Sequence, residues 1–246
     1  MTINTLYSKL IFDANPVSYW RLGEAAPTDS VAVDEMGQQN GTYVGTQGTG
    51  TDLVNEANGA MSFDVRNIPP TAYVSIASNA VLDITGDLTI ECWVMCFDSL
   101  GGCLYDSGLS GGSCSLNVGQ NSFNGRAYPY IGFAGDQYPT QFDASTWPLD
   151  LTLNLFHVMA VITGTTYILY LNGNAVFSGT FPSRSSVTAT RYIGRDSGNF
   201  RGFMGRIDEV AIYNTALTYQ QARDHYNVGS TGKLAGPDFP IARGRG

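Results

Sequence analysis

The sequence predicts an all-β protein, an antiparallel β-sandwich of jelly-roll type with short helices near both ends. Short segments with strand-like alternation recur along the chain with almost no helical pattern between them, which favours antiparallel pairing over βαβ units. The chain contains 29 glycines, as expected of many short strands joined by tight turns. Its 246 residues are an ordinary length for one large β domain.

The N-terminal part of the chain predicts one short helix, one strand and one turn. Residues 6–15 carry apolar side chains at helical spacing, and Pro16 would stop the helix. Residues 17–22 then alternate as a strand. Asn-Gly is the strongest short turn signal, so we expect a turn at Asn40-Gly41.

The rest of the chain predicts further strands and one well-marked helix. The expected strands are residues 72–77, 88–97, 157–162, 166–171, 175–178, 192–194 and 203–213. Asn172-Gly173 predicts a hairpin turn between two of them. Thr218 and Gln221 form a capping-box pattern at a helix start, and Gly229 is placed as its C-terminal cap. We therefore expect one domain over residues 1–229 and an extended Gly/Pro-rich tail over 230–246.

Composition excludes several classes of partner. The formal net charge of −8 argues against nucleic acid, because binding to nucleic acid depends on Lys and Arg neutralising phosphates. The first twenty residues have no apolar run of the kind a secretory signal needs, and no stretch is long and apolar enough to span a membrane. We expect synthesis in the cytoplasm without a signal peptide, and no membrane insertion.

Cysteine and histidine residues do not form a metal-binding pattern. Four cysteines fall in one region, with no C-x-x-C spacing and no histidine nearby: Cys92, Cys96, Cys103 and Cys114. Their positions favour small buried hydrophobic residues over metal ligands or disulfides. His157 is expected to be a strand residue paired within the sandwich, and His225 a residue on the helix surface.

The segment 203–217 (Phe-Met-Gly-Arg-Ile-Asp-Glu-Val-Ala-Ile-Tyr-Asn-Thr-Ala-Leu) reads as a strand followed by the start of a capped helix. It resembles the last strand of the concanavalin A-like jelly roll in its laminin-G-like branch. Further segments resemble the same family in the same order: residues 17–24, 32–43, 88–94 and 156–173. The resemblance covers residues 17–229 and implies a concanavalin A-like fold.

The start of the chain carries a narrower resemblance. Asn15-Pro16 ahead of Tyr-Trp-Arg-Leu-Gly-Glu at 19–24 looks most like the minor tail proteins of tailed bacteriophages. This resemblance implies a non-enzymatic virion component, at the tail or an exposed particle surface, that binds host carbohydrate or other virion subunits. The alternative is a secreted or cell-surface carbohydrate-binding module of a bacterium. A homo-oligomer is left open.

The patterns that would indicate an enzyme are not met. Glycosidase relatives use Glu-x-Asp-x-x-Glu to place carboxylates on one sheet face, and Glu91 has no such partners. Asp208 and Glu209 are adjacent, so on a regular strand they would point to opposite faces. Residues 108–112 satisfy G-x-S-x-G but lie in a Gly/Ser-rich loop, not in a strand-to-helix elbow. We therefore expect no catalytic residues.

Asp208 is a lone carboxylate in an otherwise apolar strand, so it needs a partner. In similar jelly rolls a structural calcium ion joins the first and last strands. The resemblance implies that this ion is held by Asp208, Glu24 and the carbonyl of Gly41. The alternative is that Asp208 accepts backbone hydrogen bonds or pairs with Arg206 or Arg21.

Aromatic side chains indicate a candidate carbohydrate site in the region 120–150, which is rich in loops and least like the family. Exposed aromatic rings stack on sugar faces, and four such residues gather here: Tyr128, Tyr130, Tyr138 and Trp147. The competing interpretation is that these rings belong to the core, as most aromatic residues do.

Overall fold

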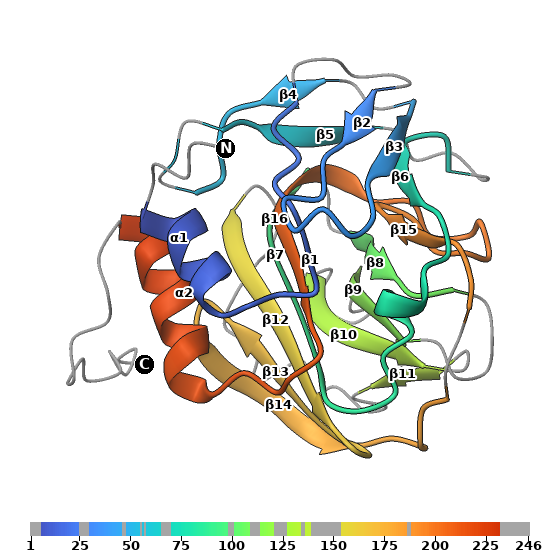
Figure 1. Ribbon diagram of the computed structural model, residues 1–246, viewed down its shortest axis with the longest axis vertical. Coiled ribbons are helices and arrows are strands. Elements are labelled where there is room, and N and C mark those ends of the chain that lie inside the picture. The colour runs from blue at the N-terminus through green and yellow to red at the C-terminus, as the bar shows by residue number, and fades with distance from the viewer. Residues whose placement is uncertain are drawn as a thin grey trace.

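The computed structural model describes residues 6–24, 30–45, 48–54, 56, 58–64, 70–97, 101–108, 114–120, 127–133, 136–138, 154–185 and 188–231 (Figure 1). Its elements, in chain order, are α1 (Leu6–Asp13), β1 (Ser18–Trp20), β2 (Val31–Ala32), β3 (Gly41–Val44), β4 (Thr49–Gly50), β5 (Ala60–Asp64), β6 (Tyr73–Ile76), the 3-10 helix η1 (Ala80–Leu82), β7 (Leu88–Cys96), β8 (Gly101–Asp106), β9 (Cys114–Gln120), β10 (Ala127–Phe133), β11 (Asp136–Tyr138), β12 (Leu155–Thr163), β13 (Thr166–Leu171), β14 (Asn174–Thr180), β15 (Arg191–Ile193), β16 (Met204–Tyr213) and α2 (Tyr219–Thr231).

The strands form two sheets. The first has the order β14-β13-β12-β7-β16-β5-β4, and β1 also pairs with β16. The second has the order β11-β10-β9-β8-β15-β6-β3-β2. Every strand pairing among the described residues is antiparallel, which confirms the predicted sandwich.

The first sheet is buried on both faces. Its inner face packs against the second sheet through residues such as Val94, Val158 and Ile207. Its outer face is covered by α1 and α2, which lie side by side at the left of Figure 1. Trp93 belongs to this outer cluster and Trp20 to the inner core, and both are buried as the sandwich prediction requires. Because β7 lies between the two clusters, nearly all of its residues are buried.

Two local predictions are confirmed. Asn172 and Gly173, with φ angles of 51° and 72°, turn β13 into β14, since both adopt the left-handed conformation of a type I′ turn. The capping box is also formed: the Gln221 N–H donates to Thr218 Oγ1 at 3.2 Å, and the Thr218 N–H donates to Gln221 Oε1 at 2.9 Å.

Two predictions about glycines are wrong. Gly229 does not cap α2, which continues to Thr231, so the predicted domain boundary at residue 229 falls inside the helix. Gly229 instead packs against Trp93, and a Cβ there would lie 2.8 Å from Trp93 Cε2. Gly41 is not in a turn: it begins β3 and pairs with both β2 and β6. The turn precedes it, where the Asp34 carboxylate accepts the backbone N–H groups of residues 36, 38 and 39.

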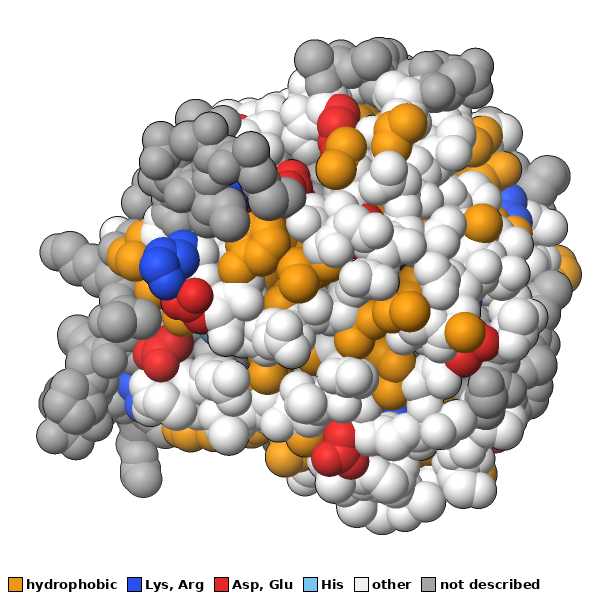
Figure 2. Space-filling model, in the orientation of Figure 1, with side chains coloured by type: hydrophobic (Ala, Val, Ile, Leu, Met, Phe, Trp, Pro, Cys, Tyr) orange, Lys and Arg blue, Asp and Glu red, His pale blue; other side chains and the backbone are white. Residues whose placement is uncertain are grey.

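The cysteines and the surface agree with the composition. All four cysteines are buried and free, as expected of small core residues. Charged side chains are few on the face drawn in Figure 2, in keeping with a charged content of 14%. Among the described helices none is long and apolar enough to cross a membrane.

Candidate functional site

The outer face of the second sheet carries a group of tyrosines and arginines. In β9 and β10, Leu116 and Ile131 point into the core, so their neighbours Asn117 and Tyr130 point outward. Asn117 and Tyr130 lie opposite each other in the strand register. We call the residues Tyr73, Asn117, Tyr128, Tyr130, Tyr192, Arg195 and Arg201, together with the exposed Phe200 of the turn between β15 and β16, the tyrosine–arginine face; Tyr128 also packs against the core.

One end of this face is built on β10. The rings of Tyr128 and Tyr130 lie 5.9 Å apart, and Arg201 Nη1 donates to Tyr130 Oη at 3.1 Å. Gly119 makes room for this pair, because a Cβ there would lie 2.7 Å from Tyr130 Cε1. Burial raises the pKa of both tyrosines, so both hydroxyls are protonated at neutral pH. Tyr130 is only 3% exposed, which leaves Tyr128 as the more accessible ring.

The other end lies three to four strands away, about 14–19 Å at the usual strand spacing. Tyr73 on β6 and Tyr192 on β15 make an edge-to-face contact with ring centroids 5.8 Å apart. The Arg195 guanidinium carbon lies 4.2 Å from the Tyr73 centroid and 4.0 Å from the Tyr192 centroid. Both tyrosines are half-buried, so they present part of each ring to solvent.

A tight turn between β15 and β16 carries the remaining residues of the face. Arg195 pairs with Gly202 in an antiparallel bridge, and Asp196 Oδ1 accepts the N–H groups of Phe200 and Arg201 at 2.8 and 3.0 Å. These bonds hold Phe200 at the turn with 72% of its surface exposed. Phe200 is thus an accessible aromatic ring in the turn that also carries Arg195 and Arg201.

Asn117 contributes a polar group to the floor of the face. It is 1% exposed, and its Nδ2 donates to Ser115 Oγ at 2.7 Å. Its Oδ1 is buried without a hydrogen-bond partner. Because both Asn117 and Tyr130 are almost fully buried, they form the floor of the face beneath its accessible residues.

The structure brings together only part of the carbohydrate site predicted from the sequence. Tyr128 and Tyr130 are neighbours on one face. Tyr138 on β11 lies opposite Ile131 in the register, and its ring packs with Phe181 at 5.9 Å on the core side. Trp147 lies outside the described residues. Sequence reasoning missed Phe200 and Arg195, although Phe200 stands in a Gly-Asn turn, where an aromatic residue has little core to join.

Asp208 is the part of the predicted calcium site that fits a cation. It is fully buried, and its Oδ2 accepts the Leu53 N–H at 3.2 Å. Its Oδ1 is buried without a partner. Burial raises the pKa of Asp208 well above its usual range, so a charged Asp208 needs a nearby positive charge. The alternative interpretation of Asp208 is met in part. One of its carboxylate oxygens accepts a backbone N–H, and no described arginine pairs with either oxygen.

The other two predicted ligands are engaged differently. Glu24 accepts the Val33 N–H at 2.8 Å and the Tyr43 hydroxyl. Burial raises the pKa of Tyr43, and the charges of Glu24 and Asp208 raise it further, so Tyr43 lies in the field of both carboxylates. Gly41 sits in the second sheet on the same strand as Tyr43. No cluster of three His, Cys, Asp or Glu side chains that could hold a metal ion occurs in the described part of the chain.

Asp208 and Glu209 do not follow simple strand alternation, and the expectation of opposite faces is wrong. The register shifts between Asp208 and Ala211, and Glu209 has a φ of 55°, so the strand bulges here. Glu209 accepts the Tyr19 hydroxyl and pairs with Arg21 Nε at 3.1 Å. Both Tyr19 and the Asp208 partner Leu53 belong to the outer cluster of the first sheet.

A buried ionic cluster centred on Glu91 lies beneath α2. His157 Nε2 is 2.7 Å from one carboxylate oxygen, His225 Nδ1 is 2.9 and 3.0 Å from the two oxygens, and Tyr213 donates its hydroxyl. Burial alone would raise the pKa of Glu91, but the two histidines outweigh it and hold that pKa well below its usual range. The prediction that His225 lies on the helix surface is wrong, since it is 1% exposed. This cluster joins the helix to the sheet.

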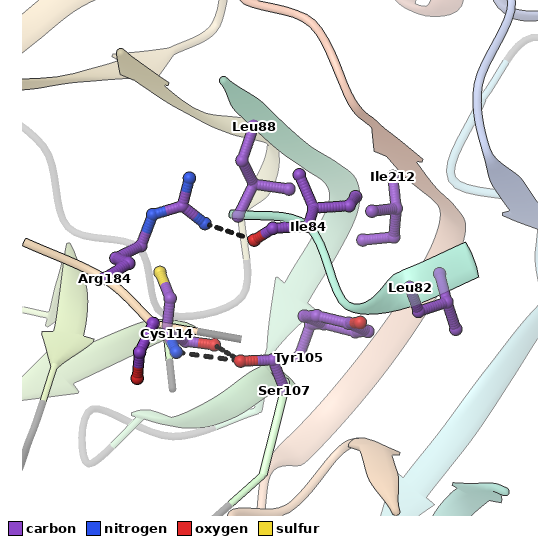
Figure 3. Close-up of a pocket in the computed structure, with 9 residues that line it drawn as sticks. Leu82, Ile84, Leu88, Tyr105, Ser107, Cys114, Arg184 and Ile212 are labelled. Carbon is purple, nitrogen blue, oxygen red and sulfur yellow. Dashed lines mark hydrogen bonds between the residues drawn. The ribbon is translucent and has the colours of Figure 1, made fainter. Parts of the chain in front are cut away.

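A small pocket opens between the sheets (Figure 3). Leu88 and Ile212 line it from the first sheet, and Tyr105 and Cys114 from the second. Arg184 closes one side by donating from Nη1 to the Ile84 carbonyl at 3.3 Å. Its volume of about 20 Å³ suits a single water molecule and not a sugar ring. The tyrosine–arginine face is therefore the better candidate for a ligand site.

Comparisons with known proteins agree with this architecture. Residues 69–223 match the family model Laminin_G_3, described as the concanavalin A-like lectin/glucanases superfamily. No curated protein matches the chain in sequence.

Three solved structures share the fold. Domain 4 of AbnA, a GH43 extracellular arabinanase from Geobacillus stearothermophilus in complex with arabinotriose, is 17% identical with a TM-score of 0.59, over 86% of this chain and 98% of that one. Trypanosoma rangeli sialidase is 16% identical with a TM-score of 0.61, over 87% of this chain and 33% of that one. The binding domain of botulinum neurotoxin DC in complex with SialylT is 11% identical with a TM-score of 0.54, over 86% and 51%.

Proposed function

This chain belongs to the concanavalin A-like lectin/glucanases superfamily, and from that premise we propose that it is a non-enzymatic carbohydrate-binding protein of a bacteriophage particle. The saccharide would lie across the outer face of the second sheet. The observation that carries the proposal is Phe200, an aromatic ring with 72% of its surface exposed, in the turn whose Arg195 lies over Tyr73 and Tyr192 and whose Arg201 donates to Tyr130. Rings of this kind stack on sugars, while Arg201 supplies N–H donors for hydroxyl groups.

The test of saccharide binding is a glycan array followed by titration of the best ligand. Phe200→Ala is expected to weaken binding about tenfold, equal to about 1.4 kcal/mol. The matched control is Tyr219→Ala, which removes an aromatic ring with 45% exposure from α2, away from this face. Equal losses in both variants, or no loss in Phe200→Ala, would place the ligand elsewhere.

The virion role is supported by the resemblance of residues 7–24 to phage minor tail proteins. In that role the protein would bind host surface carbohydrate or other virion subunits and would reach the exterior by particle assembly and lysis. Mass spectrometry of purified particles is the direct test. Absence of the protein from particles, together with genomic neighbours of a polysaccharide-utilisation type, would favour the second candidate.

That second candidate is a bacterial secreted or cell-surface carbohydrate-binding module. It is favoured by the AbnA domain, which the chain covers almost entirely and which was solved with arabinotriose. Both candidates share the absence of catalysis. Release of reducing sugar from host polysaccharide by the purified protein would refute the non-enzymatic part of the proposal.

For metal binding, we keep Asp208 alone as the anchor of a structural calcium ion, because Glu24 is hydrogen-bonded to Val33 and Tyr43 and Gly41 lies in the second sheet. The unpartnered buried Oδ1 of Asp208 supports this assignment. A bound ion would neutralise the buried carboxylate.

A further inference from the structure

Arg195 occupies an unusual position for a charged residue. Its guanidinium carbon lies within 4.2 Å of two tyrosine centroids, those of Tyr73 and Tyr192, and the residue is only 8% exposed. Gly194, with a φ of 85°, turns the chain just before it, and a Cβ there would lie 2.6 Å from Phe63 Cδ1. The backbone and the two rings together fix the guanidinium in place.

Arg195 has no counterion among the residues that the structure describes. Its Nε is buried without a hydrogen-bond partner, and no described carboxylate pairs with it. The other well-buried arginine, Arg191, pairs with Asp83, and the partly buried Arg21 pairs with Glu56. A buried charge without a partner is costly, and contact with two tyrosine rings offsets only part of that cost. The buried Nε without a partner, and the lack of a described carboxylate beside the guanidinium, therefore point to an anionic ligand.

The acidic side chains near this face are occupied. Asp106 accepts the Gly108 N–H, the Ser197 N–H and the Ser197 hydroxyl at 2.8, 2.8 and 2.9 Å. Asp196 accepts two backbone N–H groups of its own turn. Burial also raises the pKa of Asp106, although its bonds with Ser197 partly offset this. Neither carboxylate neutralises Arg195.

A second arginine adds to the same preference. Arg201, on the opposite leg of the turn, donates from Nη1 to Tyr130 and forms no ion pair with a described carboxylate. Arg195 and Arg201 lie on the two legs of one turn, so two positive charges gather on one face of a chain of net charge −8. A guanidinium presents its N–H groups in a planar fork that matches a carboxylate, and the Tyr73 and Tyr192 rings, whose centroids are 5.8 Å apart, cover two adjacent sides of Arg195 and leave the others to a ligand.

We propose that the tyrosine–arginine face binds a saccharide that carries a carboxylate, and that Arg195 receives the carboxylate. The inference rests on the proposed carbohydrate-binding function and narrows its ligand class to acidic sugars. Arg201 supplies a second positive charge along the same saccharide. Phe200 contacts an adjacent ring.

Isothermal titration with matched sugar pairs tests this inference. Tetragalacturonate is compared with its methyl ester, and sialyllactose with lactose, because each pair differs in the carboxylate or the residue that carries it. At least one acidic member is expected to bind at least tenfold more tightly than its neutral counterpart. Raising NaCl from 50 to 500 mM is expected to weaken that binding, because salt screens the charge.

Variants then assign the effect to Arg195. Arg195→Met is expected to weaken binding of the acidic sugar at least tenfold and to leave the neutral sugar unchanged. Arg195→Lys keeps the charge without the planar fork and is expected to remain at least threefold weaker than the unmodified protein. The matched control is Arg223→Met, since Arg223 also lies over a tyrosine ring, that of Tyr219, at 5.5 Å on α2. Circular dichroism melting confirms that each variant is folded.

The outcomes separate this inference from the proposed function. Equal affinity for acidic and neutral sugars, or an acidic-sugar affinity unchanged in a folded Arg195→Met variant, overturns the inference and leaves saccharide binding standing. Binding to neutral saccharides alone also overturns the inference and leaves saccharide binding standing. Binding to no saccharide of either kind, on these pairs and on the array, overturns both.

Discussion

Replacement of Glu91 by glutamine is expected to destabilise the protein strongly. Glu91 is fully buried and accepts hydrogen bonds from three side chains, two of them histidines at 2.7 and 2.9 Å. Glutamine keeps one oxygen and replaces the other with an NH₂ group, so either His157 or Tyr213 then faces a donor. The loss of one charge-assisted bond costs about 1.5–3 kcal/mol, and weakening of the others adds about 1–2 kcal/mol.

The expected total for Glu91→Gln is therefore about 3–5 kcal/mol, the range found when one partner of a buried pair is removed. For a chain of this length that corresponds to a fall in melting temperature of about 10 °C. Urea denaturation followed by tryptophan fluorescence measures it. The control is Asp13→Asn, which removes the same charge from an exposed pair with Lys9 and is expected to cost no more than about 0.5 kcal/mol. A loss below 1 kcal/mol in Glu91→Gln would refute the view that this cluster fastens α2 to the sheet.

Three further predictions concern pH, packing and metal. Because the pKa of Glu91 is lowered in the folded state, its stabilising contribution is complete above the ordinary carboxyl pKa of about 4.3 and is lost as pH falls through the folded pKa. Urea titrations from pH 6 to pH 2 should therefore show that the free energy of unfolding falls more steeply in the unmodified protein than in Glu91→Gln. The same dependence on pH in both proteins would contradict this. Gly229→Ala gains up to about 1 kcal/mol of helix propensity but forces a Cβ against the buried Trp93 ring, so a net destabilisation of about 1–2 kcal/mol is expected. The control is Gly86→Ala, where a Cβ meets nothing within 4 Å, and it should change stability by less than about 0.5 kcal/mol. Equal changes in stability in Gly229→Ala and Gly86→Ala would exclude a clash between the new Cβ and Trp93. If calcium binds at Asp208, EDTA should lower the melting temperature by about 5–10 °C, because a hundredfold excess over Kd is worth about 2.7 kcal/mol, and Asp208→Asn should abolish that sensitivity. A melting temperature unchanged by EDTA would show that no calcium ion binds at Asp208. Asp208 would then be a buried, hydrogen-bonded carboxylate.

The candidate site was only partly visible in the sequence. Tyr128 and Tyr130 were found because they lie close together in one segment of the chain. Arg195 was missed because its meaning depends on Tyr73, which lies more than a hundred residues away and reaches it only through the pairing of β15 with β6. Tyr138 was grouped with the other tyrosines by proximity in sequence, but its register position turns it toward the core. Adjacency along a chain does not decide which face of a sheet a side chain occupies once strands pair.

The sequence by itself determined the features that depend on neighbouring residues. The Asn172-Gly173 hairpin and the Thr218 capping box follow from backbone preferences and short-range hydrogen bonds, and the antiparallel sandwich follows from alternation repeated along the chain. Only the tertiary structure decided the features that depend on desolvation. The sequence predicts His225 on the helix surface, but packing of α2 on the sheet buries it and places it beside Glu91. The sequence predicts Gly229 as a helix cap, but in the structure it lies inside the helix, where it packs against Trp93. Burial creates the need for these partners, and burial is a property of the packed layers and not of any local segment.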